Sequence, residues 1–286
     1  MAVETNTILT TDLARVREID FVTQFNGALT KLVEALGITR KLEVQDGATL
    51  KQLRVTGDLA SQVAEGELIP LSHYETEEVP VGEVKLNKWR KATTAETILK
   101  GGYDQAVGAT TDKMVKDIQK TIRNDLFAYL ANGTGSATGN GIQAALANAW
   151  GNLQILWEDD AVDTVFFLNP LDVADYLATA QITTQNAFGM SYIENFLGLG
   201  MVILNSSVPK GKFYATAIEN VILYHVNVSN SKLAQAFDLT TDETGYIGVS
   251  EYPDKDTARV MDLVLSGVTF FAERVDGIVV GTIAGG

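Results

Sequence analysis

The sequence predicts an α+β fold with a long protruding loop, and three observations support this class. Residues 20–36 and 104–130 carry apolar side chains at the spacing of a helix that is buried on one face. Short strand-like runs separated by turn residues follow from 162 to 283. Between the two helices, residues 56–99 form a β excursion that is punctuated by glycine and proline. We therefore expect a mixed fold from which one β segment projects.

The first element is an amphipathic helix over residues 20–36. Asp20 suits the N-cap, and Gly37 suits the position after the C-terminus. The helix packs either on its own domain or on a neighbour, and residues 1–19 are polar, as in an arm or tail. Its apolar face consists of Phe21, Val22, Phe25, Leu29, Leu32, Val33 and Leu36.

The excursion has two limbs, residues 57–70 and 83–90, and the second limb alternates apolar with polar side chains. Ordering about 40 residues costs roughly 40 kcal/mol of backbone entropy. At about 25 cal/mol per Å², offsetting that cost requires burial of about 1,600 Å² of apolar surface. An isolated two-stranded hairpin cannot bury so much against itself. We therefore expect another subunit to cover it.

The charges of the excursion have two interpretations. Six glutamates between 65 and 83 precede a basic limb at 85–91. The charges can pair across the hairpin, at well under about 1 kcal/mol per pair. Alternatively, the basic limb docks on an acidic neighbour such as region 124–209, which has no lysine or arginine. The candidate inter-subunit residues are Glu65, Gly66, Ile69, Lys85, Lys88, Trp89, Arg90 and Lys91.

A long helix is predicted over residues 104–130, ending at Asn132-Gly133. At 1.5 Å per residue it spans roughly 40 Å. The glycine-rich stretch 133–141 then predicts a flexible joint between domains. A phosphate-binding loop is a weaker interpretation, because it requires a strand before the glycines and this stretch follows a helix.

Residues 140–230 resemble a compact α/β unit, and the remainder returns to strands. Asn169-Pro170 opens a helix that runs to 178, and another helix is expected at 142–149. The predicted strands are 162–168, 201–204, 212–215, 221–226, 246–250, 259–265, 268–272 and 278–283.

Composition narrows the function. The chain has 286 residues and a net charge of −14, and residues 131–286 carry 17 Asp and Glu against 6 Lys and Arg. Such a surface repels phosphate backbones, which argues against sequence-specific nucleic-acid binding but not against enclosing nucleic acid. The absence of cysteine excludes disulfides and thiolate sites. We see no signal peptide or membrane span, and expect synthesis in a cytoplasm.

The sequence predicts no catalytic residues, no cofactor and no metal site. Its two histidines, His73 and His225, lie in unrelated segments, the first in the exposed excursion and the second in an apolar strand. The acidic runs 158–160 and 254–256 are weak candidates for a hard cation, since adjacent loop carboxylates are usually solvated.

In their order, these elements resemble the major capsid proteins of tailed bacteriophages with the Hong Kong 97-type fold. The resemblance rests on six segments: the turn 64–70, the limb 84–91, Ala95-Glu96-Thr97-Ile98-Leu99, Val165-Phe166-Phe167-Leu168-Asn169-Pro170, the segment 208–216 and the segment 219–224. It implies an N-terminal arm at 1–54 and an extended loop at 55–100. A peripheral domain around a spine helix would combine 101–134 with 235–286, and an axial domain with a central sheet would occupy 135–234.

The resemblance also implies a function. The chain would be a structural protein, not an enzyme, that assembles as hexamers and pentamers into an icosahedral phage head enclosing double-stranded DNA. The expected location is the virion, assembled in the bacterial host cytoplasm. With the first helix at residue 20, a separate scaffolding protein is expected, beside a portal and a candidate decoration protein. The absence of lysine between Glu67 and Glu83 argues against a covalent cross-link through the loop.

Two other functions stay open. An encapsulin-type nanocompartment resembles this fold but encloses cargo protein. A cytoplasmic α/β enzyme with 135–234 as its catalytic domain is the other alternative, although the segment lacks convergent polar residues. The size of the purified species separates a shell from an enzyme.

Overall fold

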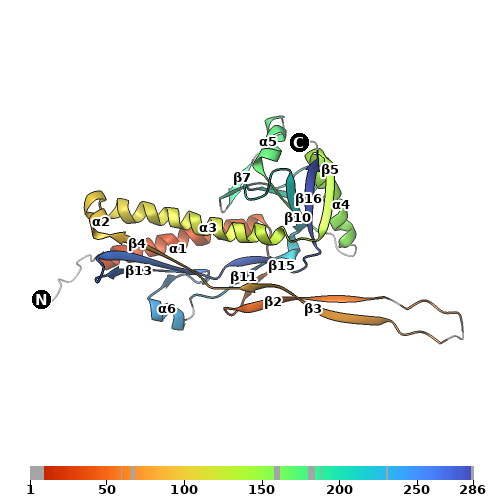
Figure 1. Cartoon of the computed structure of the whole chain (residues 1–286), viewed down its shortest axis with the longest axis horizontal. Coiled ribbons are helices and arrows are strands. Elements are labelled where there is room, and N and C mark those ends of the chain that lie inside the picture. The colour runs from red at the N-terminus through yellow and green to blue at the C-terminus, as the bar shows by residue number, and fades with distance from the viewer. Residues whose placement is uncertain are drawn as a thin grey trace.

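A computed structural model describes residues 10–58, 60–65, 68–157, 162–179, 184–187, 189–229 and 231–284. The body has two lobes, and a long hairpin projects from it (Figure 1). One lobe is built on two long helices and the other on a seven-stranded sheet. The predicted α+β class is confirmed.

The two long helices are α1 (Thr10–Ala35) and α3 (Ala109–Leu130). All seven apolar residues predicted for the first helix are at most 4% exposed and belong to a core within the same chain, which extends to strands of the seven-stranded sheet. The helix begins ten residues before the predicted start, so Asp20 is an exposed position inside it and not its N-cap. Gly37 follows the helix with a φ of +64°, as expected for a C-terminal glycine.

The predicted long helix is confirmed, with one irregularity at its start. Residues Asp104–Gly108 form a π-helical turn that leads into α3. A short helix, α2 (Ala95–Gly101), precedes it, and the Thr94 hydroxyl accepts a hydrogen bond from Thr97 N at 3.4 Å. Thr94 is therefore the N-cap of α2.

The projecting hairpin consists of β2 (Ala48–Asp58) and β3 (His73–Val84), which pair only with each other among the described strands. The first limb therefore starts nine residues earlier than predicted. The predicted second limb is wrong, because the chain leaves the hairpin at Val84. The alternation in 84–91 belongs to β4 (Asn87–Thr94), which is half-buried against its own lobe.

Two smaller sheets complete this lobe. In the first, β4 lies beside β14 (Arg259–Ser266), β13 (Ile247–Asp254) and β12 (Thr240–Thr241). The second contains β1 (Lys41–Glu43), β11 (Val221–His225) and β15 (Thr269–Ala272). A short helix, α6 (Ser231–Phe237), lies near them.

The second lobe contains a seven-stranded sheet in the order β5-β16-β10-β6-β9-β8-β7. Helix α4 (Gly141–Leu156) covers its first strands, and α5 (Pro170–Thr179) follows β6. The strands are β5 (Gly135–Asn140), β6 (Thr164–Leu168), β7 (Gln185–Ala187), β8 (Met190–Ile193), β9 (Met201–Leu204), β10 (Lys212–Ala217) and β16 (Ile278–Ala284).

Three expectations for this lobe are corrected. The glycine-rich stretch 133–141 is not a flexible joint but the edge strand β5, and its glycines permit close packing. A Cβ on Gly139 would lie 2.3 Å from the backbone nitrogen of Ala145 in α4. The C-terminal strand β16, which we expected in the peripheral domain, pairs with β5 and β10 in the central sheet. Conversely, β11 was expected in the axial domain and lies in the three-stranded sheet.

Candidate inter-subunit surface

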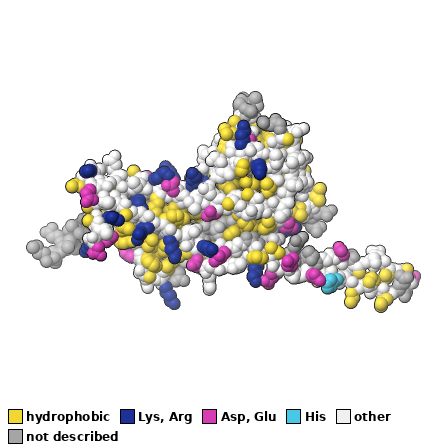
Figure 2. Space-filling model, in the orientation of Figure 1, with side chains coloured by type: hydrophobic (Ala, Val, Ile, Leu, Met, Phe, Trp, Pro, Cys, Tyr) yellow, Lys and Arg dark blue, Asp and Glu magenta, His cyan; other side chains and the backbone are white. Residues whose placement is uncertain are grey.

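The end of the hairpin exposes large apolar side chains. Leu68, Ile69 and Leu71 are 92%, 77% and 95% exposed, and we call these three the tip residues. Figure 2 shows hydrophobic side chains toward this end of the molecule. Contiguous exposed apolar groups of this kind mark sites of protein or membrane contact.

The two strands of the hairpin carry exposed charges of both signs. Lys51 on β2 and Glu78 on β3 form a cross-strand ion pair at 2.6 Å. Glu83 pairs with Lys85 at 2.8 Å, and this hydrogen bond raises the pKa of Lys85. The predicted charge pairing within the hairpin therefore occurs. The basic residue that β2 contributes is Lys51, which was not among the predicted residues. Exposed pairs of this kind contribute little to stability.

The base of the hairpin is anchored to the body. Val84 is fully buried, and a Cβ on Gly82 would lie 2.4 Å from the ring of Phe271. The carboxylate of Asp46 accepts a hydrogen bond from Leu86 N at 2.7 Å. The body thus sets the direction in which the hairpin leaves it.

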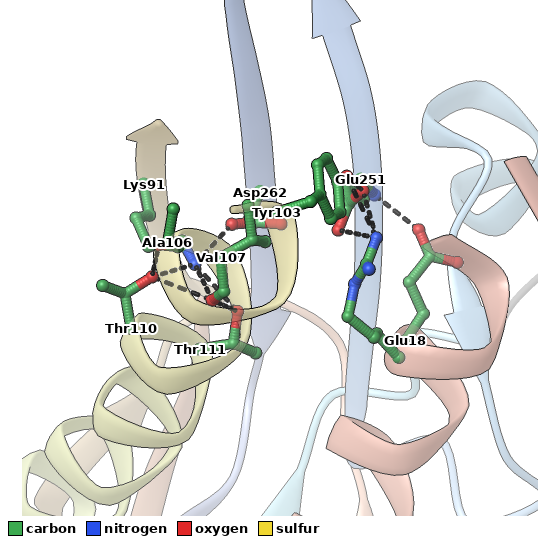
Figure 3. Close-up of polar contacts among 10 residues, drawn as sticks. Glu18, Lys91, Tyr103, Ala106, Val107, Thr110, Thr111, Glu251 and Asp262 are labelled. Carbon is green, nitrogen blue, oxygen red and sulfur yellow. Dashed lines mark hydrogen bonds and ion pairs between the residues drawn. The ribbon is translucent and has the colours of Figure 1, made fainter. Parts of the chain in front are cut away.

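Strand β4 directs its basic residues to opposite faces. Lys91 is paired in register with Asp262 on β14, and its Nζ lies 2.8 Å from Asp262 Oδ2. The same ammonium donates to Thr110 Oγ1 at 2.9 Å, Thr111 Oγ1 at 2.8 Å and Val107 O at 3.2 Å (Figure 3). Lys91 therefore ties β4 and β14 to the π-helical turn and is turned toward its own subunit.

A second polar cluster lies beside Lys91 (Figure 3). Arg17 on α1 bonds Glu251 on β13 at 2.8 Å, and the Tyr103 hydroxyl donates to the same carboxylate. Glu18 accepts from Glu251 N at 2.5 Å and from the Thr240 hydroxyl. These contacts join α1 to the four-stranded sheet and to the turn before α3.

Burial shifts the titration of this region. Desolvation raises the pKa of Asp262, and the hydrogen bond from Lys91 opposes the shift. Desolvation also raises the pKa of Glu18, against the hydrogen bonds from Thr240 and Glu251 N. The pKa of Tyr103 is raised by burial and by its donation to Glu251. The hydrogen bonds of this cluster join separate elements of the fold, and we therefore assign it a structural role.

The predicted contact residues have three different placements. Glu65 and Ile69 are exposed on the connection between β2 and β3, whereas Gly66 lies outside the described residues. The structure places Trp89 against the core, and turns Lys91 inward as described above. Lys85, Lys88 and Arg90 are exposed near the base of the hairpin and on β4.

Sequence reasoning missed two of the three tip residues, Leu68 and Leu71. The signal was present as the run Leu68-Ile69-Pro70-Leu71, which stands between polar residues. Proline disfavours a central strand, so this apolar run was more consistent with an exposed turn than with a core strand.

The described part of the chain contains no group of three histidine or acidic side chains arranged to hold a metal ion. His73 is exposed on the hairpin, and His225 is buried with its ring 4.8 Å from that of Tyr246, both as expected. Residues 158–160 of the first acidic run lie outside the described residues, although Trp157 before them is described.

The second acidic run, 254–256, is described and closes a turn. The carboxylate of Asp254 accepts from Asp256 N at 3.2 Å and from the Thr257 hydroxyl, and these bonds lower the pKa of Asp254. Separately, no described helix has the length and apolar character required to cross a membrane.

Comparison with known proteins gives matches of fold only. No family model and no curated protein sequence matches this chain. The cyanophage A-1(L) capsid aligns with a TM-score of 0.57 at 10% identity, over 89% of this chain and 93% of that chain. The structure of Mycobacterium phage Patience aligns at 0.53 and 11% identity, over 100% and 95%. The SrpI encapsulin of Synechococcus elongatus PCC 7942 aligns at 0.51 and 14%, over 99% and 91%.

Proposed function

We propose that this chain, which has the Hong Kong 97-type fold, is the major capsid protein of a tailed bacteriophage and not an enzyme. In this proposal it assembles into an icosahedral head that encloses double-stranded DNA. The observation that carries it is the tip of the hairpin, where three large apolar side chains stand almost fully exposed on an element of only two strands.

An isolated hairpin is marginal in water, and exposed apolar side chains add to its cost. A second copy that covers the tip residues removes this cost. Permanent assemblies of this kind bury more than about 2,000 Å² per interface. A contact between the tip of one copy and a different surface of the next is heterologous, and such contacts form a ring when the rotation from copy to copy closes. Rings of five and six copies are the units from which an icosahedral shell is built.

The charge of the chain agrees with enclosing DNA without binding it. A net charge of −14 repels phosphate groups, so packaged DNA would be held by the closed shell and not by specific contacts. The partners that we propose are further copies of the chain, a separate scaffolding protein, a portal and, on the outer surface, a decoration protein. The location is the virion, and assembly takes place in the bacterial host cytoplasm.

The experiment is the mass of the purified protein by size-exclusion chromatography with light scattering. We expect a megadalton particle from the unmodified chain. We expect a variant with Leu68→Ser, Ile69→Ser and Leu71→Ser to stay small while keeping the circular dichroism of a folded protein. Gln62→Ser, a polar exchange in the same connection, is the matched control and should form particles. Normal particles from the triple variant would refute the role of the tip.

An encapsulin-type shell is a second candidate, favoured by the alignment with the SrpI encapsulin over 99% of this chain. The contents of the particles separate the two functions. Nuclease-protected double-stranded DNA in phage-derived particles supports the capsid. A stoichiometric cargo protein without DNA supports the nanocompartment.

A further inference from the structure

A buried histidine lies close to the point where the hairpin joins the body. His225 is the last residue of β11 and is 9% exposed, and its ring meets that of Tyr246 edge to face at 4.8 Å. Its Nδ1 has no hydrogen-bond partner among the described residues. The neutral ring can leave this nitrogen as an unpaired acceptor at modest cost. Protonation makes both ring nitrogens donors, so it would bury a charge beside an unpaired donor.

The short strand β1 lies against His225 and leads directly into the hairpin. All three residues of β1 are exposed, and β1 pairs only with β11 among the described strands. The end of β1 is fixed at His225 itself, because Val44 N donates to the backbone oxygen of His225 at 2.9 Å. The His225 ring also hydrogen-bonds to the backbone of Leu42 in β1. A short, exposed strand of this kind opens locally at a low cost in free energy.

The two strands of the hairpin are held to the body separately. On β3, Gly82 packs closely against the ring of Phe271 in β15. Strand β2 is held through β1, the connection 44–47 and one long contact of 3.5 Å between Gln52 Nε2 and Asp276. Release of β1 therefore loosens one strand of the hairpin while the other stays fixed, which allows the hairpin to change its direction relative to the body.

Three titratable groups act on this site. Glu43 lies on β1 in register with His225, and its charge favours the imidazolium. Tyr246 covers the ring, and Asp242 acts on Tyr246. Burial outweighs the effect of Glu43, so the pKa of His225 lies below its usual value of 6.5. The Glu43 carboxylate is exposed and accepts from Asn227 Nδ2 at 3.2 Å, so an imidazolium that leaves its buried position has an anion close by.

We propose that His225 is a pH-dependent latch on β1, which holds β1 against β11 while the ring is neutral and releases it when the ring is protonated. The imidazolium moves out toward Glu43, β1 separates from β11, and the hairpin becomes free to change direction. The stability from the buried ring is complete above pH 6.5 and is lost as the pH falls through the lowered pKa. The latch is a property of the single subunit, and only its effect on assembly rests on the function proposed above.

The experiment is hydrogen exchange of the unassembled subunit at about pH 7.5 and about pH 5.5, with each rate corrected for the chemical exchange rate at that pH. We expect the protection of the amides of residues 41–47 to fall about three- to tenfold at the lower pH. Tenfold is the ceiling, because this pH lies about one unit below the usual pKa of 6.5. The amides of α3 should keep their protection and serve as the internal reference.

Two variants without a titrating ring are the controls. His225→Phe keeps an aromatic ring beside Tyr246 but cannot be protonated, and His225→Gln is smaller and neutral. We expect both to show equal protection of residues 41–47 at the two pH values, with the circular dichroism of a folded protein. An unchanged protection in the unmodified chain would overturn the latch, and so would an equal loss in the unmodified chain and the two variants.

The variant Glu43→Gln tests where the imidazolium goes. It removes the charge that favours protonation, so we expect the midpoint of the loss of protection to move to lower pH. Glu96→Gln, an exposed position on α2, is the matched control and should leave the midpoint unchanged. The chain has two histidines, so His73→Gln leaves His225 as the single histidine whose ring protons are followed by NMR. A midpoint that moves to higher pH, or does not move, would overturn the role of Glu43.

The outcomes separate this inference from the proposed function. A subunit that shows no pH-dependent release but forms megadalton particles overturns the latch and leaves the capsid function standing. A subunit that shows the release but forms no particles under any assembly condition overturns the capsid function and leaves the latch standing.

Discussion

At the scale of single residues, the side chain of Lys91 shows how a charge pattern is misread without the fold. Its place in a basic run predicted a contact with a neighbour. The pairing of β4 with β14 instead puts it opposite Asp262, in a site where both side chains are less than 20% exposed. Alternation in the sequence identified the strand, but the strand's partner could not be read from alternation, because strand pairing is non-local.

Removing one member of the Lys91–Asp262 pair should lower the stability of the folded subunit. Lys91→Met leaves Asp262 buried without its cation, so we expect the free energy of unfolding to fall by about 3–5 kcal/mol. Urea unfolding of the unassembled subunit measures it. The double variant Lys91→Met, Asp262→Leu should recover much of the loss, because no buried charge remains. A single variant as stable as the unmodified chain would contradict the assignment of Lys91 to the interior.

The same site gives a pH dependence. Burial raises the pKa of Asp262 above the usual 3.8, so the native state binds more protons there than the unfolded chain. The stability from this group is complete below pH 3.8 and is lost as the pH rises through the raised pKa. Relative to Asp262→Asn, the unmodified chain should therefore lose stability above pH 3.8. Urea unfolding from about pH 3.5 to about pH 7 measures the difference. A difference that stays constant over this range would contradict the shift.

At the scale of elements, the sequence predicted the segments with a clear hydrophobic period. It did not predict where two elements pack in close contact. The buried face of α1, the length of α3 and the strand β9 all follow from local patterns. The stretch 133–141 failed because glycine suggests flexibility in a sequence, whereas here it permits contact. Gly139 lies so close to α4 that no side chain fits. Such a requirement appears only when two elements are in place.

A pair of glycine variants tests this reading. Gly139→Ala should lower the free energy of unfolding by about 1–3 kcal/mol, since its Cβ would overlap the backbone of α4. Gly27→Ala is the matched control, because Gly27 lies inside α1 and a Cβ there meets nothing within 4 Å. It should stabilise the protein by about 0.5–1 kcal/mol. Thermal unfolding of both variants measures these changes. A Gly139→Ala variant as stable as the unmodified chain would contradict the packing role of Gly139.

At the scale of the whole molecule, exposed apolar side chains are concentrated at the tip of the hairpin, although the body also exposes some, such as Leu99 and Ile155. The order of elements along the chain predicted this architecture, including the central sheet and the projecting loop. Two strands were assigned to the wrong lobe: β11 lies in the three-stranded sheet and β16 in the seven-stranded sheet. Sequence order alone does not show which sheet a strand joins. The proposed assembly accounts for the exposed tip residues.

The most direct measurement of whether another copy covers the hairpin is hydrogen exchange of its backbone amides in particles and in unassembled subunits. We expect the amides of residues 60–72 to exchange rapidly in the free subunit and slowly in the particle, because a neighbour excludes water from them. The amides of α3 should exchange at similar rates in both states and serve as the internal reference. Equally rapid exchange of residues 60–72 in intact particles would contradict the account.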